Sequence, residues 1–434
     1  MKTLGLDIGT TTISAVVYDH EMGLLSGRTI KNDTFLQGQS FERIQDPCLI
    51  YEKALEAVKA MRALHPDVRA IGVTGQMHGI LYLDACGNPL SPLYTWQDGR
   101  GDLPHDDRFS WADYLADLTG YSVYTGYGLV THAYNLHHGL VPQAAACLCT
   151  IHDYIAMKLS GRSRPVTDPT DAASLGFYHC TGRCFDRAAL KQAGIDAGML
   201  PALAEDPRLG PGPLGIPVYM AIGDNQASFL GATGGRTDVL LVNIGTGSQV
   251  SVYSPDYLQI ETLETRPFPE GGWLLVGASL CGGRSYALLE NFFRQAVRMV
   301  TGSDESVYDA MARLLDASGE VTDYPEICTL FQGNRREPGL RGSVTGISTD
   351  NFTPLHFMYG IMHGMARELY NLYSGYLSLG GQAPSAMIGS GNGLRRNPHL
   401  CRIMEATFGC PLILSENDEE AACGAAIFAA KHCK

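Results

Sequence analysis

Two stretches of the sequence, about half a chain apart, share one pattern, and this repetition constrains the fold more than any other feature. They are LGLDIGTTTISAVVYD at 4–19 and VLLVNIGTGSQVSVY at 239–253, and each joins two apolar runs through a Gly/Thr turn. Short apolar runs separated by so few turn residues predict β-hairpins. Because a pattern that returns along a chain indicates repeated structure, we expect two similar domains that face each other. The 434 residues also exceed what one hydrophobic core usually serves.

Helical and strand patterns alternate between the two hairpins. Apolar residues at helical spacing fill 41–65, and a short apolar run follows at 70–75, which is the alternation typical of an α/β protein. A Pro/Gly-rich stretch at 201–217 predicts an irregular surface segment. A strand that runs into a Gly-Asp turn and a helix follows it. We therefore predict an N-terminal domain of residues 1–235 and a C-terminal domain of residues 236–434.

The second half contains two further segments with helical spacing, 354–379 and 419–432. In the second of them Gly424, Ala425 and Ala426 follow one another. Such small residues let a helix lie close against a neighbouring element.

The two Gly/Thr turns have the composition of phosphate-binding turns. Backbone N–H groups of such a turn point into one concavity, and threonine hydroxyls add donors. Asp7, at the end of the first apolar run, would be repelled by a bare phosphate but suits a magnesium ion that accompanies a nucleotide, directly or through water. The alternative is an ordinary hairpin whose threonines merely favour strands. No GxxxxGK[ST] motif occurs, so this is not a Walker A loop.

A third glycine cluster, AMIGSGNGLRRNPHLCRIMEATFG at 386–409, predicts a strand, a turn and a helix. Its glycines would let a flat group approach the backbone closely. The motifs thus follow in the order DxGTTT, GTGS, GSGNG and an EEAxxGAA helix.

With these four motifs in order, the chain resembles the FGGY family of carbohydrate kinases over essentially its whole length. The family pattern continues in VTGQMHGILYLDACGNPL at 73–90, TWQDGR at 95–100, TDPTDAASLGFY at 167–178, GDNQAS at 223–228, VGASLCGG at 276–283 and LRGSVTGIS at 340–348. The resemblance implies two actin-like (ribonuclease H-like) ATPase domains of α/β class, with a deep cleft between them.

The same resemblance implies ATP as the phosphate donor, Mg²⁺ as its companion and Asp7 as the metal ligand. It also implies that the first two turns bind the phosphates of ATP and that the glycine pairs farther along the chain lie beside the adenosine. The residues implied on the nucleotide side are Thr10, Thr11, Thr12, Gly245, Thr246, Gly282, Gly283, Gly389, Gly391 and Asn392.

On the sugar side, the resemblance implies that Asp224 is the catalytic base. It would accept the proton of the attacking sugar hydroxyl, and the alternative is a helix cap. Asn225 would hydrogen-bond the sugar, since an amide both donates and accepts. The remaining substrate-binding candidates are Gln76, Met77, His78 and Trp96.

For two of these candidates an ordinary structural role is the alternative. A lone histidine such as His78 is more often structural, but this one follows a predicted strand end, where α/β proteins place ligands. Trp96 offers a flat apolar face to a sugar ring, and a buried core residue is the alternative. Asp98 and Arg100 are interpreted as an internal ion pair that shapes the pocket wall.

The chain departs from the family pattern at Ser14. Many members carry Lys or Arg two residues after the threonine turn, so a cationic contact to the γ-phosphate is missing there. Another basic residue takes it over, or backbone donors and Mg²⁺ suffice; the sequence leaves both open. Phe357 and Met358 replace an Arg-Ala pair that is frequent in relatives, in a helix that we interpret as packing.

Composition narrows the location and the partners. The net charge of −13 argues against nucleic acid or an anionic membrane surface. No apolar run is long enough for a membrane span, and no leader pattern is present, so we expect a cytoplasmic protein. A homodimer is the commonest assembly and is the default expectation. The twelve cysteines are interpreted mostly as core residues, with a zinc site near Cys147–His152 and Cys180–Cys184 as the lesser alternative.

The motifs GQMHG and WxDxR are typical of the family's ketose kinases. Together with IHDY at 151–154 and GSGNGLRRN, they most resemble sedoheptulokinases, which predicts phosphate transfer to the terminal primary hydroxyl of sedoheptulose. D-Xylulose is the alternative acceptor, because the two ketoses differ mainly in length. Two other classes remain open: a weakly catalytic sugar-binding sensor, and an actin-like ATPase that turns over without sugar.

Overall fold

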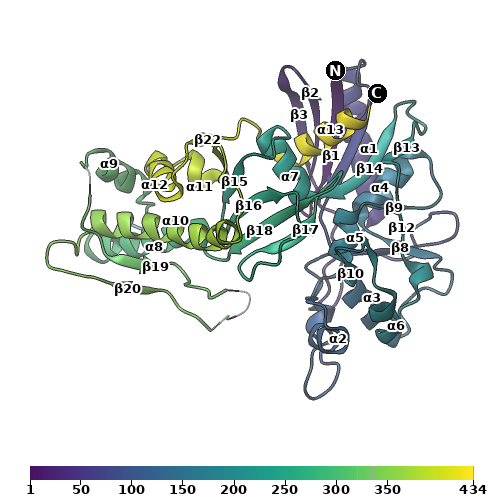
Figure 1. Ribbon diagram of the computed structural model, residues 1–434, viewed down its shortest axis with the longest axis horizontal. Helices are drawn as coiled ribbons and strands as arrows, with labels where there is room; N and C mark the ends of the chain where they lie inside the picture. Colours follow the sequence, from purple (N-terminus) through teal and green to yellow (C-terminus); the bar gives the residue numbers. More distant parts are fainter. Residues whose placement is uncertain (320, 335–336, 338, 434) are drawn as a thin grey trace. The chain divides into compact units, whose positions relative to one another are not determined.

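The computed structural model describes residues 1–319, 321–334, 337 and 339–433, which form two compact units, each built on a mixed sheet (Figure 1). The first unit comprises Met1–Gly235, Arg266–Gly272 and Asn417–Lys434; the second comprises Arg236–Thr265 and Trp273–Glu416. The α/β class predicted from the sequence is confirmed. The sequence pattern gave no indication of the two segments that return to the first unit.

The sheet of the first unit has the strand order β13–β14–β5–β1–β2–β3. Its strands are β1 (Lys2–Ile8), β2 (Thr12–Asp19), β3 (Gly23–Lys31), β5 (Ile71–Gly75), β13 (Arg208–Gly210) and β14 (Val218–Gly223). β1, β2 and β3 are antiparallel neighbours, whereas β1, β5 and β14 are parallel. The first predicted hairpin is therefore confirmed, with Ile8 opposite Ile13.

Helices cover both faces of this sheet. They are α1 (Pro47–Leu64), α4 (Ile151–Ser160), α7 (Asp224–Thr233) and α13 (Glu420–His432). On β5, a Cβ at Gly72 would meet the backbone of α13, and a Cβ at Gly75 would meet His152 of α4. Residues three apart on a strand point to opposite faces, so α13 and α4 lie on opposite sides. Figure 1 shows α13 beside α7 and the first strands, with both chain ends nearby.

The first of these helices begins later than the sequence pattern predicts. Residues 41–65 have helical spacing, but α1 begins at Pro47. The Asp46 side chain accepts hydrogen bonds from the N–H groups of Cys48 and Leu49 and so caps the helix. Proline at the first helical position fixes this start, and the preceding residues Ile44–Gln45 form β4 instead.

The sheet of the second unit has the order β17–β18–β16–β15–β21–β22. Its strands are β15 (Leu240–Ile244), β16 (Ser248–Ser254), β17 (Glu264–Pro267), β18 (Trp273–Ser279), β21 (Met387–Ser390) and β22 (Leu412–Leu414). β15, β16 and β18 are antiparallel, and β15, β21 and β22 are parallel. This repeats the pairing pattern of the first sheet, so the second predicted hairpin is also confirmed.

The helices of the second unit are α8 (Gly282–Thr301), α9 (Tyr308–Asp316), α10 (Pro354–Ser378), α11 (Asn392–Arg395) and α12 (Pro398–Phe408). α10 buries Met358, Met362 and Met365 in the core together with strand residues such as Val242. The interpretation of that helix as a packing element is thereby confirmed, and Phe357 packs partly buried against the same core.

Short elements complete both units. In the first they are β6 (Leu81–Leu83), β7 (Leu93–Tyr94), a 3₁₀ turn (Gly99–Asp102), α2 (Trp111–Thr119), α3 (Gly128–His137), β8 (Cys147–Cys149), β9 (Val166–Thr167), α5 (Pro169–Leu175), β10 (Tyr178–His179), β11 (Cys184–Phe185), α6 (Arg187–Gln192), a 3₁₀ turn (Ala197–Met199) and β12 (Ala202–Leu203). In the second they are β19 (Glu326–Cys328) and β20 (Ser343–Thr345). No helix of the described residues is both long and apolar enough to cross a membrane.

Candidate active site

The predicted metal ligand Asp7 and the predicted sugar-side residues Gln76 and Asp224 lie at one edge of the first sheet. Asp7 is the second-to-last residue of β1. Gln76 follows β5 directly, and Asp224 follows β14 directly. The three strands are parallel neighbours, and Gly75 is in register with both Ile8 and Gly223. Because the carboxyl ends of parallel strands meet at the same edge, the fold brings these side chains together.

Two side chains hold the first Gly/Thr turn by hydrogen bonds to its carbonyl groups. Asn32 Nδ2 donates to the Gly9 carbonyl over 2.8 Å, and Gln45 Nε2 donates to the Thr10 carbonyl over 2.9 Å. Thr11 and Thr12 remain exposed. A turn fixed through its carbonyls, with its hydroxyls presented outward, has the form that a phosphate needs.

Gln76 joins this turn to the predicted sugar loop. Its side chain is 3% exposed; its Oε1 accepts from Thr10 Oγ1 over 3.2 Å, and its Nε2 donates to Gln45 Oε1 over 2.9 Å. Thr10 Oγ1 also accepts from Trp96 Nε1 over 2.9 Å. Trp96 is 46% exposed, so it is not the core residue that was the alternative. Its ring nitrogen is fixed by this bond and almost half of the residue surface is exposed, as a sugar platform requires.

His78 is fixed in an unusual backbone conformation. Its φ of 73° lies in the left-handed region, which is uncommon for a residue other than glycine and is frequent at functional sites. The ring Nδ1 lies 2.7 Å from the Ser174 carbonyl, and the ring stacks on Tyr127 at 4.5 Å between centroids. A carbonyl only accepts, so Nδ1 carries a proton and Nε2 is the acceptor of the neutral ring.

Asn225 and Met77 lie beside Asp224. Asn225 Nδ2 donates to Asp224 Oδ1 over 3.0 Å and lies 3.7 Å from Met77 Sδ. Asp224 is the first residue of α7, and the helix has no side-chain cap. Its carboxylate is therefore not the cap that was the alternative, and it stands at the positive end of the helix dipole.

Burial raises the pKa of both acidic residues of this edge, Asp7 and Asp224. The pKa of Asp7 is raised to about 7 by burial, with the charges of Asp224 and Glu419 acting in the same direction. Burial also raises the pKa of Asp224, while His152 and Arg266 oppose that rise. Carboxylates that share a poorly solvated site bind a cation or retain a proton, so both are functional candidates.

Asp98 and Arg100 form the internal ion pair that the sequence predicts. Arg100 Nε lies 2.6 Å from Asp98 Oδ1, and both side chains are almost wholly buried. Arg100 also contacts Glu42 at 3.3 Å and lies over the Tyr94 ring at 4.2 Å. The pair connects the segment after β7 to the loop before β4 and does not reach Asp224 through any hydrogen bond of the described residues.

Residues of α4 and α5 belong to this site but were not predicted. Thr170 Oγ1 accepts from the N–H of Gly223 over 3.0 Å, and Ser174 Oγ accepts from the N–H of His78 over 3.3 Å. His152 and Asp171 form a buried pair nearby. The motifs IHDY and TDPTDAAS were recognised only as family patterns, because nothing in their spacing indicates which strand ends they contact.

The predicted nucleotide-side residues of the second unit gather at one end of β15, whereas Thr10, Thr11 and Thr12 belong to the first unit. Gly283 and Arg284 donate their N–H groups to the carbonyls of Gly245 and Thr246, each over 3.0 Å. A Cβ at Gly282 would lie 2.4 Å from the backbone of Gly247. These glycines therefore let α8 begin directly against the Gly-Thr-Gly turn. The N-terminus of this long helix is an anion-binding position.

The third glycine cluster packs on the same strand end. Gly391 has φ of 84°, and a Cβ there would lie 2.5 Å from the Ile244 carbonyl. Asn392 begins α11, and Gly389 lies within β21, beside β15. Gly389 is buried, and a Cβ there would meet the side chains of Leu394 and Leu412. The glycines of this cluster therefore allow close packing on β15, and Asn392 is the exposed residue among them.

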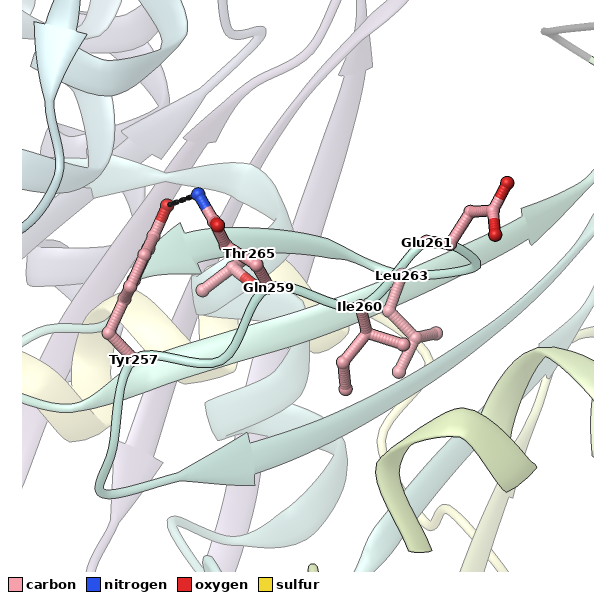
Figure 2. Close-up of a pocket in the computed structure, with 6 residues that line it drawn as sticks. All are labelled: Tyr257, Gln259, Ile260, Glu261, Leu263 and Thr265. Carbon is pink, nitrogen blue, oxygen red and sulfur yellow. Dashed lines mark hydrogen bonds between the residues drawn. The ribbon is translucent and has the colours of Figure 1, made fainter. Parts of the chain in front are cut away.

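A separate pocket of the second unit lies away from these turns. It is lined by Tyr257, Gln259, Ile260, Glu261, Leu263 and Thr265 (Figure 2). β16 starts at the Gly-Thr-Gly turn and ends at Ser254, and the pocket follows that far end. No motif of the sequence pointed to it, and it plays no part in the site described above.

Comparison with known proteins identifies the chain. Residues 2–231 match the N-terminal domain, and residues 240–433 the C-terminal domain, of the FGGY family of carbohydrate kinases. The chain belongs to this family. The resemblance stated from its motifs is therefore confirmed, and the protein is a carbohydrate kinase.

Relatives of this FGGY kinase match along its whole length. Sedoheptulokinase of Mus musculus is 29% identical, over 98% of this chain and 96% of that protein. Among solved structures, a xyloylose kinase from Brucella ovis has a TM-score of 0.84 at 20% identity, covering 100% of this chain and 90% of the other. A xylulose kinase from Rhodospirillum rubrum has a TM-score of 0.82 at 22% identity, covering 99% and 89%. The structures share the fold.

FGGY kinases use ATP as the phosphate donor, so the substrates of this chain are ATP and a sugar. No group of three or more His, Cys, Asp or Glu side chains within the described ranges is arranged to hold a metal ion, and every described cysteine is a free thiol. Of the residues considered for zinc, His152 instead contacts Asp171.

Proposed function

We propose that this kinase transfers the γ-phosphate of ATP to the terminal primary hydroxyl of sedoheptulose and releases sedoheptulose 7-phosphate and ADP. The observation that carries the proposal is the match to a sedoheptulokinase over 98% of this chain and 96% of that relative. The ketose motifs GQMHG and TWQDGR support the same substrate class.

In this reaction Asp224 accepts the proton of the attacking hydroxyl and holds the oxygen toward the phosphorus. Its position supports the role: it begins α7 at the sheet edge, with Asn225 bonded to its carboxylate and His78 on the neighbouring loop. Asn225 and His78 Nε2 bind sugar hydroxyls, and the exposed Trp96 ring packs against the carbon face. Gln76 keeps the phosphate turn and the sugar loop in register.

The donor set at the first turn fits Mg²⁺. The ion prefers oxygen ligands, and Asp7 offers a carboxylate whose pKa is raised to about 7 by burial and by the charges of Asp224 and Glu419. A divalent cation offsets that repulsion. Asp7 would hold it directly or through water, and the bound ion supplies charge neutralisation to the phosphates. Thr11 and Thr12 donate their hydroxyls to the phosphates beside it, and Thr10, whose hydroxyl donates to Gln76, contributes its backbone N–H.

The nucleotide binds the second unit through its backbone turns. Gly245 and Thr246 present N–H groups to the phosphates, and the N-terminus of α8 at Gly282 and Gly283 adds its dipole. The adenosine lies along Gly389, Gly391 and Asn392, of which Asn392 is exposed at the start of α11.

A coupled ADP-release assay tests the proposal. The purified kinase is given Mg-ATP with sedoheptulose, D-xylulose, D-ribulose, L-ribulose, glycerol and gluconate, and kcat/KM is measured for each. We expect the highest value for sedoheptulose. A higher value for any other sugar contradicts the substrate, and no turnover with any of them favours a binding protein.

D-Xylulose is the second candidate, because xyloylose and xylulose kinases are among the structures that match the fold. It would use the same residues in the same roles. The two ketoses differ in length, so a pocket separates them through depth and through polar groups left unpaired. The ratio of the two kcat/KM values in the same assay decides between them.

A further inference from the structure

Tyr124 is an exposed aromatic residue beside the candidate site that none of the motifs contains. It lies in the segment 120–127 between α2 and α3, and it is 51% exposed. Its ring meets the Tyr127 ring edge to face at 5.8 Å between centroids, and its hydroxyl has no hydrogen-bond partner among the described residues. Single exposed apolar side chains are common, so the surroundings of Tyr124 decide whether its exposure has a function.

The backbone on both sides of Tyr124 is fixed. Val123 is 4% exposed and belongs to the core of this unit, and Tyr127 packs partly buried against the same core. Thr125 Oγ1 donates to a carboxylate oxygen of Asp102, at the end of the 3₁₀ turn. The exposed ring of Tyr124 therefore stands on an anchored segment of the chain.

This segment also contacts two of the proposed sugar-binding residues. A Cβ at Gly126 would lie 2.0 Å from the Trp96 carbonyl oxygen, so the segment passes directly against the backbone of Trp96. The next residue, Tyr127, stacks on the His78 ring at 4.5 Å and donates its N–H to the Tyr124 carbonyl over 3.0 Å. Tyr124 is thus held beside Trp96 and His78.

A series of contacts leads from the proposed base to Tyr124. The side-chain amide of the residue that follows Asp224 lies 3.7 Å from Met77 Sδ. His78 follows Met77 in the chain and stacks on Tyr127, and Tyr127 meets Tyr124. Asp224 is the first side chain of this series, and Tyr124 is the last.

The two candidate ketoses differ in how far they extend along such a series. Each would present its terminal hydroxyl to Asp224, so the remainder of the sugar extends away from that residue. Sedoheptulose is two carbons longer than D-xylulose. An aromatic ring offers an apolar face to the C–H groups of a sugar. An exposed ring beyond His78 can therefore contact carbons that the shorter ketose lacks.

We propose that Tyr124 is a specificity-determining residue whose ring packs against the two carbons by which sedoheptulose exceeds D-xylulose. The inference rests on the proposed function, in which the reacting hydroxyl lies at Asp224. The contact comes from the ring and not from the hydroxyl group of Tyr124. Tyr124 takes no part in the proton transfer, so its effect appears in the choice between the two ketoses.

The kinetic test measures kcat/KM for sedoheptulose and for D-xylulose in the wild type, in Tyr124→Ala and in Tyr124→Phe. Loss of apolar contact with one methylene group typically costs about 10–200-fold in kcat/KM. We expect the ratio of the sedoheptulose value to the D-xylulose value to fall about tenfold in Tyr124→Ala. Tyr124→Phe keeps the ring, so its ratio should stay near that of the wild type.

A side chain that only supports the fold predicts a different result. Tyr124→Ala would then lower both values by the same factor, and the wild-type ratio would overturn the proposal. The ratio does not depend on the fraction of enzyme that is folded, so partial unfolding of the variant cannot imitate the expected result. A ratio that falls as far in Tyr124→Phe as in Tyr124→Ala overturns the ring contact.

Tyr308→Ala is the matched control. Tyr308 of α9 is 44% exposed and also meets one other tyrosine ring, that of Tyr286, at 6.2 Å between centroids. It belongs to the second unit and has no place in the series of contacts described above. Its variant should keep the wild-type ratio. An equal fall in Tyr308→Ala would contradict a role specific to Tyr124.

A binding measurement does not depend on turnover. Calorimetry without ATP gives the dissociation constants of both ketoses for the wild type and for Tyr124→Ala. We expect the constant for sedoheptulose to rise about tenfold more than the constant for D-xylulose, because the ring contact is made on binding. Equal changes for the two ketoses overturn the proposal.

The wild-type values separate this inference from the proposed function. If the wild type prefers D-xylulose, the proposed substrate fails, and the inference fails with it. If the wild type prefers sedoheptulose and Tyr124→Ala keeps that preference, the proposed function stands and only the role of Tyr124 fails.

Discussion

At Ser14, where this kinase departs from the family pattern, the first hairpin shows which side chains are its neighbours. Asp7 and Ser14 are directly opposite in the β1–β2 register, so their side chains lie on the same face. A basic residue at this position would stand beside Asp7. Here Ser14 Oγ instead lies 3.0 Å from Thr29 Oγ1, which donates to Glu419 over 2.7 Å. Arg266 is a basic residue whose charge acts to lower the pKa of Asp224.

Replacing Asp224 by alanine should abolish turnover and leave nucleotide affinity largely intact. The carboxylate serves the sugar hydroxyl, and loss of a general base typically costs about 10²–10⁴ in rate. We expect kcat to fall by at least that factor while the dissociation constant of ATP, measured by calorimetry, changes little. Near-normal kcat in this variant would remove Asp224 from the mechanism.

The ligand-free protein should lose stability as the pH rises, because of Asp7. Its folded-state pKa of about 7 lies above the unfolded value of 3.8, so the folded state binds more protons between these values. The contribution to stability is fully present below about pH 4 and is lost as the pH rises through 7. Asp7→Asn should therefore raise the unfolding temperature at pH 8 more than at pH 5, and should inactivate the kinase.

Scanning calorimetry at both pH values measures this difference, with Asp67→Asn as the control. Asp67 is an exposed carboxylate whose pKa is lowered by its bond to Lys2. An Asp7→Asn variant that is less stable at pH 8 than the wild type would contradict the proposed environment of Asp7.

At the level of elements, the packing of α13 depends on glycines in its neighbours. A Cβ at Gly5 of β1 would lie 1.7 Å from the Ala422 carbonyl, and one at Gly72 of β5 would lie 1.9 Å from the Ala425 carbonyl. From the helix side, a Cβ at Gly424 would lie 1.8 Å from the Ala227 carbonyl of α7. The prediction that the small residues of α13 allow close packing is confirmed. The complementary glycines on β1 and β5 were not foreseen.

Gly5→Ala should destabilise the first unit strongly. The added methyl group meets backbone, which cannot rotate away, and overpacking of a core costs roughly 1–3 kcal/mol or more. Gly27→Ala is the control, since it is also a strand glycine but its Cβ would make only an ordinary contact at 3.5 Å. Denaturant titration should show a lower midpoint for Gly5→Ala alone. Equal midpoints for the two variants would contradict the close approach of α13.

At the level of the whole molecule, the same pairing pattern occurs in both sheets, but the chain does not divide in two at one point. Asn417–Lys434 returns to the first unit, where α13 packs on β1, β5 and α7. Arg266–Gly272 returns as well: Gln226 Nε2 donates to the Pro267 carbonyl over 2.8 Å, and the Phe229 and Phe268 rings meet edge to face. Together these contacts cover much of α7.

A fragment of residues 1–235 should therefore not fold by itself. Without α13 it would expose the apolar faces of β1, β5 and α7 to water, which removes much of its hydrophobic stabilisation. The control fragment carries residues 417–434 on a flexible Gly/Ser linker, and we expect it to show cooperative thermal unfolding by circular dichroism. Cooperative unfolding of 1–235 alone would contradict this dependence.

The sequence by itself determined both hairpins, the α/β class, the family and the order of the motifs. These follow from local patterns: apolar period, turn residues and glycines at short spacing, which act within a few residues along the chain. It also predicted Asp7, Asp224 and His78 as functional residues: Asp7 from its place at the end of the first apolar run, His78 from a predicted strand end and Asp224 from the family resemblance.

Only the tertiary structure decided which side chains support that site. The start of α1 depended on the Asp46 cap and Pro47, which override the apolar spacing before them. The exposure of Trp96 and its bond to Thr10 are properties of the folded chain that the motif did not indicate. The pairing of His152 with Asp171 and the return of α13 depend on the order of strands in the sheet. Strand order is set by long-range packing, and no periodicity of the sequence records it.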